Sequence, residues 1–157
     1  MTPGCVTSCS ADWRPQCKCF AAGTPVLTEW SARSSETLCA GDKVWSRNEF
    51  DPNGPLKLKR VEEVFQRFAR ILHVHLPNNV VIRTTAEHLV DTVNKGWIAA
   101  GTLQPGDQWQ TQDGLPVAVQ EMYDTGEWET VYNLRVADWH TYFVGCEEWG
   151  FSVWVHN

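Results

Sequence analysis

The sequence lacks long apolar runs and concentrated positive charge. None of its apolar runs approaches the ~20 residues that a membrane-spanning helix needs. Residues 1–5 have neither the basic start nor the apolar middle of a signal peptide. The net charge is −6 and the longest basic stretch is Lys57–Arg60, whereas binding a phosphate backbone needs many clustered basic side chains. We therefore expect neither a membrane nor a nucleic-acid partner.

Helical periodicity is also missing. No stretch of ten residues keeps the i, i+3, i+4 spacing of an amphipathic helix. Short apolar segments alternate instead with Gly, Asp, Asn and Pro turns. We predict strands at Val26-Leu27, Lys43–Trp45, Val61–Phe65, Ile71–Leu76, Val80–Ile82, His88–Thr92, Val117–Tyr123, Val131–Val136, Tyr142–Val144 and Phe151–Val155. These strands, without predicted helices, indicate an all-β fold class. Residues 1–18 show no such pattern, and we interpret them as an irregular leader.

The six cysteines are unevenly spread. They are Cys5, Cys9, Cys17, Cys19, Cys39 and Cys146. An even count suits a secreted disulfide framework, but such frameworks belong mostly to chains too short to build a core. The spacing near the start lacks the CxxC pair of a zinc site, so a structural zinc is the weaker alternative. We expect no metal and no cofactor, and inert burial for Cys39 and Cys146.

A weak internal repeat runs through the chain. Leu38–Val44 resembles Leu103–Trp109 with its Gly-Asp turn in register, and Val61–Phe65 resembles Val119–Tyr123. An alternating strand follows in each copy. Its core-facing residues would be Leu72, Val74 and Leu76 in one copy and Tyr132, Leu134 and Val136 in the other. The repeat predicts two related β units that pack around a pseudo-dyad, and chance agreement of common patterns is the alternative.

Cys19 is the candidate nucleophile. It precedes Phe20–Val26, in which a flexible glycine leads into a strand. A thiol is the best side-chain nucleophile near neutral pH, and a cysteine can attack the carbonyl of the residue before it, here Lys18. That step needs a polarised carbonyl and a proton for the leaving nitrogen. A small buried apolar role for Cys19 is the alternative.

Thr85 and His88 can supply that help. They lie three residues apart on a turn after a predicted strand. A hydroxyl with a backbone N–H can hold an oxyanion, and an imidazole can protonate the nitrogen. The TxxH pattern by itself also fits a structural histidine.

The chain ends in His156-Asn157. An asparagine side chain can attack its own backbone carbonyl, form a succinimide and break the following peptide bond. Neighbouring histidines can supply the protons, and His140 and His156 are the candidates. His73 and His75 also share a strand face, but two ligands do not make a metal site, so a solvated face is expected there.

These motifs together resemble the Hint superfamily, which includes inteins, bacterial intein-like domains, pretoxin Hint domains and hedgehog autoprocessing domains. The motifs are, in order, Cys19–Val26 for the nucleophile, Thr85–His88 with Gly96–Asp107 for the TxxH block, Val131–Val136 with Trp139–Val144 for the late hairpin, and Val155–Asn157 for the end. The resemblance implies a duplicated β unit with pseudo-two-fold symmetry, the Hint (intein-like) fold. It divides the chain into a leader at residues 1–18 and an autoprocessing domain at residues 19–157.

What the resemblance implies for activity is self-cleavage at both ends of that domain. Cys19 would perform an N–S acyl shift on the Lys18–Cys19 bond, which Thr85 and His88 would activate. Asn157 would cyclise, assisted by His156 and His140. Such a reaction is a single-turnover autocatalytic event. The expected partners are the domain's own flanking polypeptides, in a monomer without a cofactor.

Two alternatives stay open. Full splicing, as in a mini-intein that ligates its flanks, needs a Cys, Ser or Thr acceptor after Asn157. An inactive Hint-like scaffold or zinc-stabilised binding module is the other. Asn133 stands where the family often has Asp, which makes ordered splicing less certain. The domain is too short for a homing-endonuclease insert.

Redox control is a further hypothesis. A disulfide from Cys17 or Cys9 to Cys19 would trap the nucleophile. Without it, the need for a free thiolate favours a reducing compartment such as the cytoplasm during processing. The Gly-Trp-Ile-Ala-Ala run at 96–100 indicates a bacterial host protein of the intein-like or pretoxin kind.

Overall fold

The computed structural model describes residues 7–8 and 18–157, and these form two curled sheets of eight strands each. One sheet has the order β1 (Thr7–Ser8), β6 (Lys57–Arg70), β14 (Trp128–Val136), β2 (Phe20–Ala21), β8 (Val80–Thr84), β7 (Leu72–Leu76) and β13 (Glu121–Tyr123), with β5 (Lys43–Ser46) beside β6. The other has the order β12 (Val117–Ala118), β11 (Gln108–Trp109), β9 (Leu89–Thr92), β16 (Phe151–His156), β15 (Thr141–Cys146), β3 (Pro25–Leu27) and β4 (Ala32–Ser34), with β10 (Gly96–Ala99) beside β9. Three short 3-10 helices complete the described part: η1 (Ser35–Thr37), η2 (Ala100–Thr102) and η3 (Glu147–Trp149). The predicted all-β class is confirmed.

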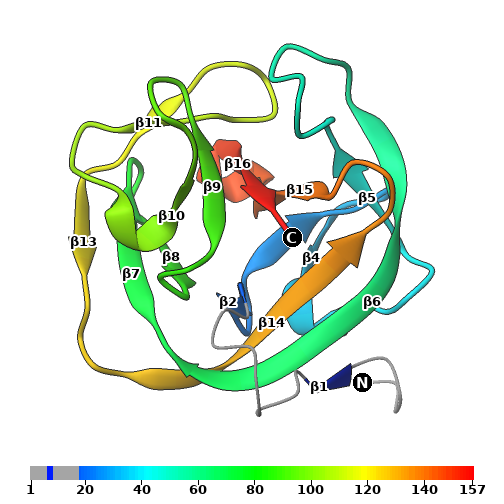
Figure 1. The fold of residues 1–157 in the computed structure, drawn as a ribbon, viewed down its shortest axis with the longest axis horizontal. Coiled ribbons are helices and arrows are strands. Elements are labelled where there is room, and N and C mark those ends of the chain that lie inside the picture. The colour runs from blue at the N-terminus through cyan, green and yellow to red at the C-terminus, as the bar shows by residue number, and fades with distance from the viewer. Residues whose placement is uncertain (1–6, 9–17) are drawn as a thin grey trace.

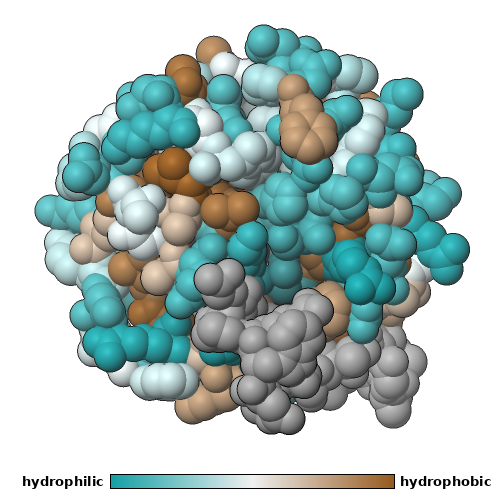
Figure 2. Space-filling view, in the orientation of Figure 1, coloured by the Kyte–Doolittle hydropathy of each residue, from teal (hydrophilic) through white to brown (hydrophobic). Residues whose placement is uncertain are grey.

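The long strands β6 and β14 form the outer wall. They pair antiparallel from Trp128 opposite Arg70 to Val136 opposite Val61, and Figure 1 shows them curving together around one side of the molecule. The last strand, β16, pairs with β15 and touches β9, so the C-terminus lies at the centre of this view (Figure 1). Figure 2, drawn from the same side, shows hydrophobic patches over β9 and β10 and a mainly hydrophilic surface on the β6 side.

The described residues form a main apolar core and a second, smaller cluster of Cys19, Ala69, Ile71 and Val131. The largest fully buried side chains include Trp109, Trp154, Tyr142 and Phe20. Burying an aromatic side chain of this size removes well over 100 Å² of surface from water, which makes such residues the main source of core stability. The Trp109 indole is also paired, because its Nε1 donates to the Trp154 carbonyl at 3.0 Å.

The internal repeat corresponds to equivalent hydrogen bonds in the two units. In the first, Gly41 N donates to the Val61 carbonyl and Val61 N to the Asp42 carbonyl, both at 2.8 Å. In the second, Gly106, Val119 and Asp107 make the same pair of bonds at 2.7 and 2.8 Å. Both turn glycines have positive φ, +99° and +91°, a conformation that glycine adopts without strain.

The side chains of the two turns repeat the pattern. The Asp42 carboxylate accepts from Cys39 N at 2.9 Å, and the Asp107 carboxylate accepts from Gln104 N at 2.8 Å. Each turn follows a 3-10 helix, η1 or η2. The predicted duplication with pseudo-two-fold symmetry is therefore confirmed.

The predicted strand positions match observed strands, but several limits differ. β6 extends over 14 residues, far beyond the predicted Val61–Phe65. Five of its nine extra residues are charged, and all nine except Ala69 are half-buried or exposed, so this mostly polar pattern hid the strand. The short strands β2, β4, β10 and β11 were missed because pieces of two to four residues carry too little periodicity to detect.

Part of the leader is described as well. Thr7–Ser8 form β1, which runs parallel to β6, so this piece of the predicted irregular leader has regular structure. Across residues 7–8 and 18–157, no helix is long and apolar enough to cross a membrane.

Candidate functional site

Cys19 is fully buried just before β2. Its thiol packs against Ala69, Ile71 and Val131. Burial raises the pKa of the thiol to about 12, and the nearby Arg67 charge offsets only part of this. Roughly one thiol in 10⁵ is then ionised at pH 7, so the resting nucleophile is protonated.

The end of β8 holds the backbone of Cys19. Cys19 N donates to the Thr85 hydroxyl at 3.0 Å, and Thr85 N donates to the Cys19 carbonyl at 2.9 Å. The Thr84 hydroxyl donates to the same carbonyl at 3.1 Å. These contacts reach the Cys19 backbone, one residue beyond the Lys18 carbonyl that Thr85 was expected to hold. The sequence analysis did not identify Thr84 as a site residue. Its position next to Thr85 was the only feature of the sequence that pointed to it.

His88 is fully buried between the two chain ends of the domain. Its Nε2 lies 2.7 Å from the His156 carbonyl oxygen, and its ring lies 4.2 Å from the Phe20 ring. The pKa of His88 is lowered to about 3, mainly by burial; the Lys18 charge acts in the same direction, and the backbones of His156 and Cys19 act in the opposite one. Within the described residues Nδ1 is buried and has no hydrogen-bond partner. His88 is therefore a neutral imidazole.

The protonation of His88 follows from its contacts. A carbonyl can only accept, so Nε2 must carry the proton and donate it to His156. In a neutral ring Nδ1 then carries the lone pair. The buried Nδ1 is thus unprotonated. The ring lies close enough to the Cys19 backbone for that backbone to raise the His88 pKa.

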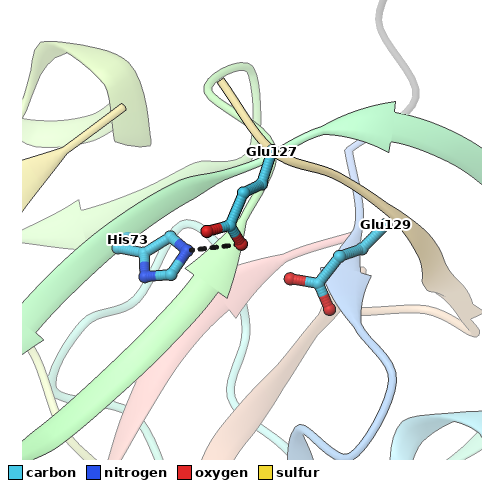
Figure 3. A group of neighbouring side chains, drawn as sticks. All are labelled: His73, Glu127 and Glu129. Carbon is cyan, nitrogen blue, oxygen red and sulfur yellow. Dashed lines mark ion pairs between the residues drawn. The ribbon is translucent and has the colours of Figure 1, made fainter. Parts of the chain in front are cut away.

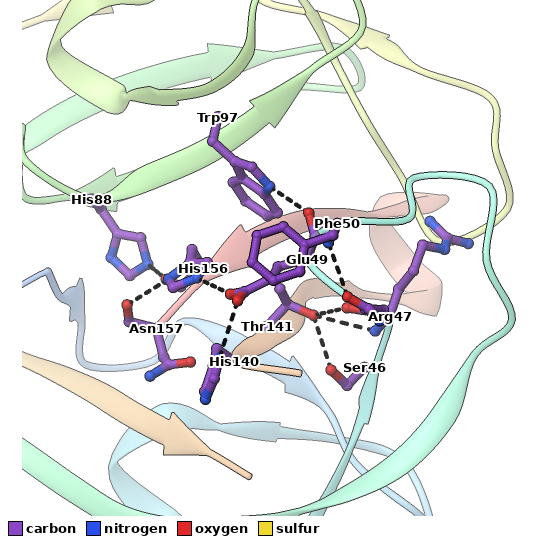
Figure 4. A network of polar contacts seen from close by, with 11 residues as sticks. Ser46, Arg47, Glu49, Phe50, His88, Trp97, His140, Thr141, His156 and Asn157 are labelled. Atoms are coloured by element: carbon purple, nitrogen blue, oxygen red, sulfur yellow. Dashed lines mark hydrogen bonds and ion pairs between the residues drawn. The ribbon is translucent and has the colours of Figure 1, made fainter. Parts of the chain in front are cut away.

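The other predicted residues meet at the C-terminus (Figure 4). Asn157 N donates to the His140 carbonyl at 2.9 Å, and His156 Nδ1 lies 2.9 Å from the Asn157 oxygen. The Asn157 Oδ1 is buried without a partner among the described residues. His140 lies in the turn between β14 and β15 with a φ of +58°. The structure therefore brings all six predicted site residues into two adjoining groups joined by His88.

Glu49 is the residue that the sequence reasoning missed. Its carboxylate, 14% exposed, contacts His156 Nε2 through one oxygen and His140 Nδ1 at 3.3 Å through the other. Glu49 lies in the loop between β5 and β6, about 90 residues or more from both histidines. No local motif marks it, because only the tertiary fold brings that loop to the C-terminus.

Asn133, at the position where the resemblance led us to expect Asp, is buried on β14. The Tyr142 hydroxyl donates to its Oδ1 at 3.0 Å. Burial raises the pKa of Tyr142 well above its ordinary value, so the phenol stays a donor. The amide of Asn133 is therefore a paired structural group next to Phe20 and the nucleophile strand.

The described cysteines differ from expectation. Cys39 is half-buried and disulfide-bonded, and Cys146 is a half-buried free thiol, so inert burial was wrong for both. Cys19 is free, so its predicted disulfide to Cys17 or Cys9 is not formed in this structure, where the thiol is surrounded by apolar side chains. Cys9 and Cys17 themselves lie outside the described residues.

One group in the described part of the chain has metal-compatible spacing: His73, Glu127 and Glu129 (Figure 3). His73 Nε2 lies 3.8 Å from Glu127, which is largely exposed, and Glu129 forms an ion pair with Arg83. The Arg83 charge competes with any cation for Glu129. His73 was expected on a solvated face, but only about a fifth of its side chain is exposed.

Comparisons with known proteins agree with the observed fold. The family model described as the pretoxin HINT domain matches residues 26–157. A solution structure of a bacterial intein-like domain from Clostridium thermocellum is 34% identical, with a TM-score of 0.78 over 90% of this chain and 99% of that one. A DnaB intein from Synechocystis sp. PCC 6803 is 18% identical, with a TM-score of 0.73 over 89% and 98%. The gp41-1 intein is 17% identical, with a TM-score of 0.72 over 90% and 99%. No curated protein sequence matches the chain.

Proposed function

Because the chain belongs to the pretoxin Hint family, we propose that it cleaves the peptide bonds at both of its own ends, Lys18–Cys19 and the bond after Asn157. Intein-like domains are self-processing and act within their own flanking polypeptide. The two cuts and the residues that make them are the finer proposal, argued below from the contacts of the site.

At the N-terminal end, the Cys19 sulfur attacks the Lys18 carbonyl carbon. The bond from that carbon to Cys19 N breaks, a thioester forms, and the thiol proton ends on the freed nitrogen. An added thiol or water then attacks the thioester carbonyl, which releases residues 1–18 and returns the Cys19 thiol. His88 Nδ1 carries a lone pair and adjoins the Cys19 backbone, so we assign it the relay of the Cys19 proton from sulfur to nitrogen during the first attack. The Thr85 hydroxyl, which accepts the Cys19 N–H, orients that nitrogen.

A base is needed because the thiol is so weakly acidic. With its pKa raised to about 12, Cys19 does not ionise by itself at neutral pH. Burial therefore protects the bond at rest. Because the pKa of His88 is itself lowered to about 3, His88 can take the proton only as the sulfur attacks the carbonyl, not before. An attached nucleophile also has an effective concentration of order 10⁵ M or more, which supplies much of the rate.

At the C-terminal end, Asn157 Nδ2 attacks its own backbone carbonyl carbon. The bond to the following residue breaks, and the products are a succinimide and a free amine, with the lost amide proton balancing the one gained by the amine. The His140 carbonyl fixes the Asn157 backbone. His156 Nδ1 lies 2.9 Å from the Asn157 backbone oxygen, where it can polarise the Asn157 carbonyl.

The observation that carries the proposal is the place of His88. One imidazole contacts the residue before Asn157 through Nε2 and adjoins the Cys19 backbone through its other side. A merely structural histidine has no need to leave a buried nitrogen unpaired, because a buried polar atom without a partner is costly.

The test is a chain with its leader kept and a reporter fused after Asn157. We expect thiol-dependent loss of residues 1–18 and release of the reporter. Cys19→Ala should stop only the loss of residues 1–18, and Asn157→Ala should stop only the release of the reporter. A leader–reporter ligation product would show splicing instead. Two inert ends in the unsubstituted chain would favour the inactive-scaffold alternative.

A further inference from the structure

Glu49 is the charged side chain that faces both histidines of the C-terminal end. One carboxylate oxygen contacts His156 Nε2 and the other lies 3.3 Å from His140 Nδ1 (Figure 4). The side chain is 14% exposed. A carboxylate so far removed from water costs free energy unless its oxygens are paired, and here the two rings pair them.

The contacts of His156 specify its protonation. Its Nε2 faces the Glu49 carboxylate and its Nδ1 faces the Asn157 oxygen. In a chain that continues past Asn157, that oxygen belongs to the carbonyl that the side chain attacks. Both oxygens can only accept, so both ring nitrogens must donate. The geometry is that of an imidazolium held between a carboxylate and the scissile carbonyl.

The loop that carries Glu49 is fixed on both sides of it. The Glu49 carbonyl accepts the Trp97 indole N–H at 2.9 Å, and the Trp97 ring stands edge-on to the His156 ring at 5.4 Å. Arg47 donates to the carbonyls of Thr111 at 3.1 Å and Gln112 at 2.9 Å. A side chain on an anchored backbone keeps its geometry, which a positioning role requires.

We propose that Glu49 is the positioning residue for cleavage after Asn157, holding His156 as the imidazolium whose Nδ1–H polarises the Asn157 carbonyl. It acts through His156 and does not itself touch the reacting atoms. The titratable groups that face the His156 ring within the described residues are Glu49 and His140, with His88 on its main-chain carbonyl. This inference rests on the proposed C-terminal cleavage.

The test compares variants of the leader–domain–reporter chain. Glu49→Gln keeps the shape and removes the charge, and it should slow reporter release at least tenfold. Glu49→Asp, which keeps the charge on a shorter side chain, should recover part of the rate. In both variants the rate of thiol-induced leader loss should stay within twofold of the rate in the parent chain. Glu148→Gln, an exposed glutamate on η3, is the matched control and should change neither rate.

A spectroscopic signature separates positioning from a structural role. In an Asn157→Ala chain, the ¹⁵N shifts of His156 at neutral pH should show a doubly protonated ring, and Glu49→Gln should convert it to the neutral form. Unchanged reporter release in Glu49→Gln, an equal fall in both cleavages, or an unchanged His156 ring would overturn the proposal. If the parent chain cleaves at neither end, the proposed function fails, and the ring signature still decides whether Glu49 holds His156.

Discussion

His88 Nε2 lies 2.7 Å from the main-chain carbonyl oxygen of His156. This contact joins the TxxH turn, which holds Cys19, to the strand that ends in Asn157. One buried ring therefore lies against the backbone at both ends of the domain. The neutral state of that ring, fixed by burial, leads to the first two predictions.

At saturating added thiol, where the N–S acyl shift limits the rate, leader loss should be nearly independent of pH between pH 6 and 9. His88 stays a neutral base above its pKa of about 3, and the thiol it activates stays protonated below about 12. A mechanism that uses free thiolate would instead gain about tenfold per pH unit. His88→Gln should lower the rate about 10²-fold or more, whereas His75→Gln, outside the site, should not. A tenfold rise per unit in the parent would exclude His88 as the base.

His88 should also make stability fall in acid. Its folded pKa is lowered from 6.5 to about 3, so between these values the unfolded chain binds the proton and the folded chain does not. The free energy of unfolding is therefore intact above pH 6.5 and falls by up to about 1.4 kcal/mol per pH unit as the pH drops toward 3. Urea unfolding of the parent and of His88→Gln checks this. The difference between their stabilities should change with pH over that window, and a constant difference would refute it.

Thr85 should matter through its hydroxyl. Thr85→Val removes the acceptor for Cys19 N, which lies 3.0 Å away, and leaves that buried N–H unpaired at a cost of about 1–3 kcal/mol. Leader loss should slow markedly, and Thr85→Ser should restore most of the rate. Thr84→Val, which removes a second donor to the Cys19 carbonyl, should have a smaller effect because Thr85 N still donates there. Equal rates for Thr85→Val and Thr85→Ser would show that the hydroxyl is not used.

The Arg47 side chain should be a main contributor to stability around the C-terminal group. It is buried and donates to three carbonyls, those of Gly54, Thr111 and Gln112. Arg47→Ala leaves these acceptors to water or unpaired and should lower the free energy of unfolding by about 2–4 kcal/mol. Arg70→Ala, which breaks an exposed ion pair with Asp124, should cost about 1 kcal/mol or less. Similar losses in thermal or urea unfolding for the two variants would contradict this.

Tyr142→Phe tests the Asn133 pair. The variant deletes the hydroxyl that donates to Asn133 Oδ1 and leaves a buried amide short of one partner. The expected loss in the free energy of unfolding is about 1–2 kcal/mol. Tyr123→Phe, at an exposed tyrosine, is the control. A neutral Tyr142→Phe would mean that the amide finds another partner.

Local patterns in the sequence predicted the two-unit β fold well. The Gly-Asp turns at 41–42 and 106–107 each need a positive-φ glycine and a carboxylate that caps the turn, and both requirements are visible in a few adjacent residues. The polar strand β6 was underestimated because only three of its fourteen residues are buried. Periodicity reports a buried face, not a strand as such.

The sequence singled out those candidate site residues that lie in short motifs. Cys19, Thr85, His88 and Asn157 each belong to one. Glu49 belongs to none, because its role depends on the loop after β5 meeting β16 and the turn before β15. Burial is likewise a property of the fold. The ordinary pKa of a free thiol therefore gave no warning that burial raises the pKa of Cys19 to about 12.

The most direct test of the central claim is the intact mass of the leader–domain–reporter chain after incubation with a small thiol. Two-sided processing predicts a domain that begins at Cys19 and ends in a succinimide at Asn157, lighter by one water than the hydrolysed form, together with free leader and free reporter. A single unchanged mass would contradict the account.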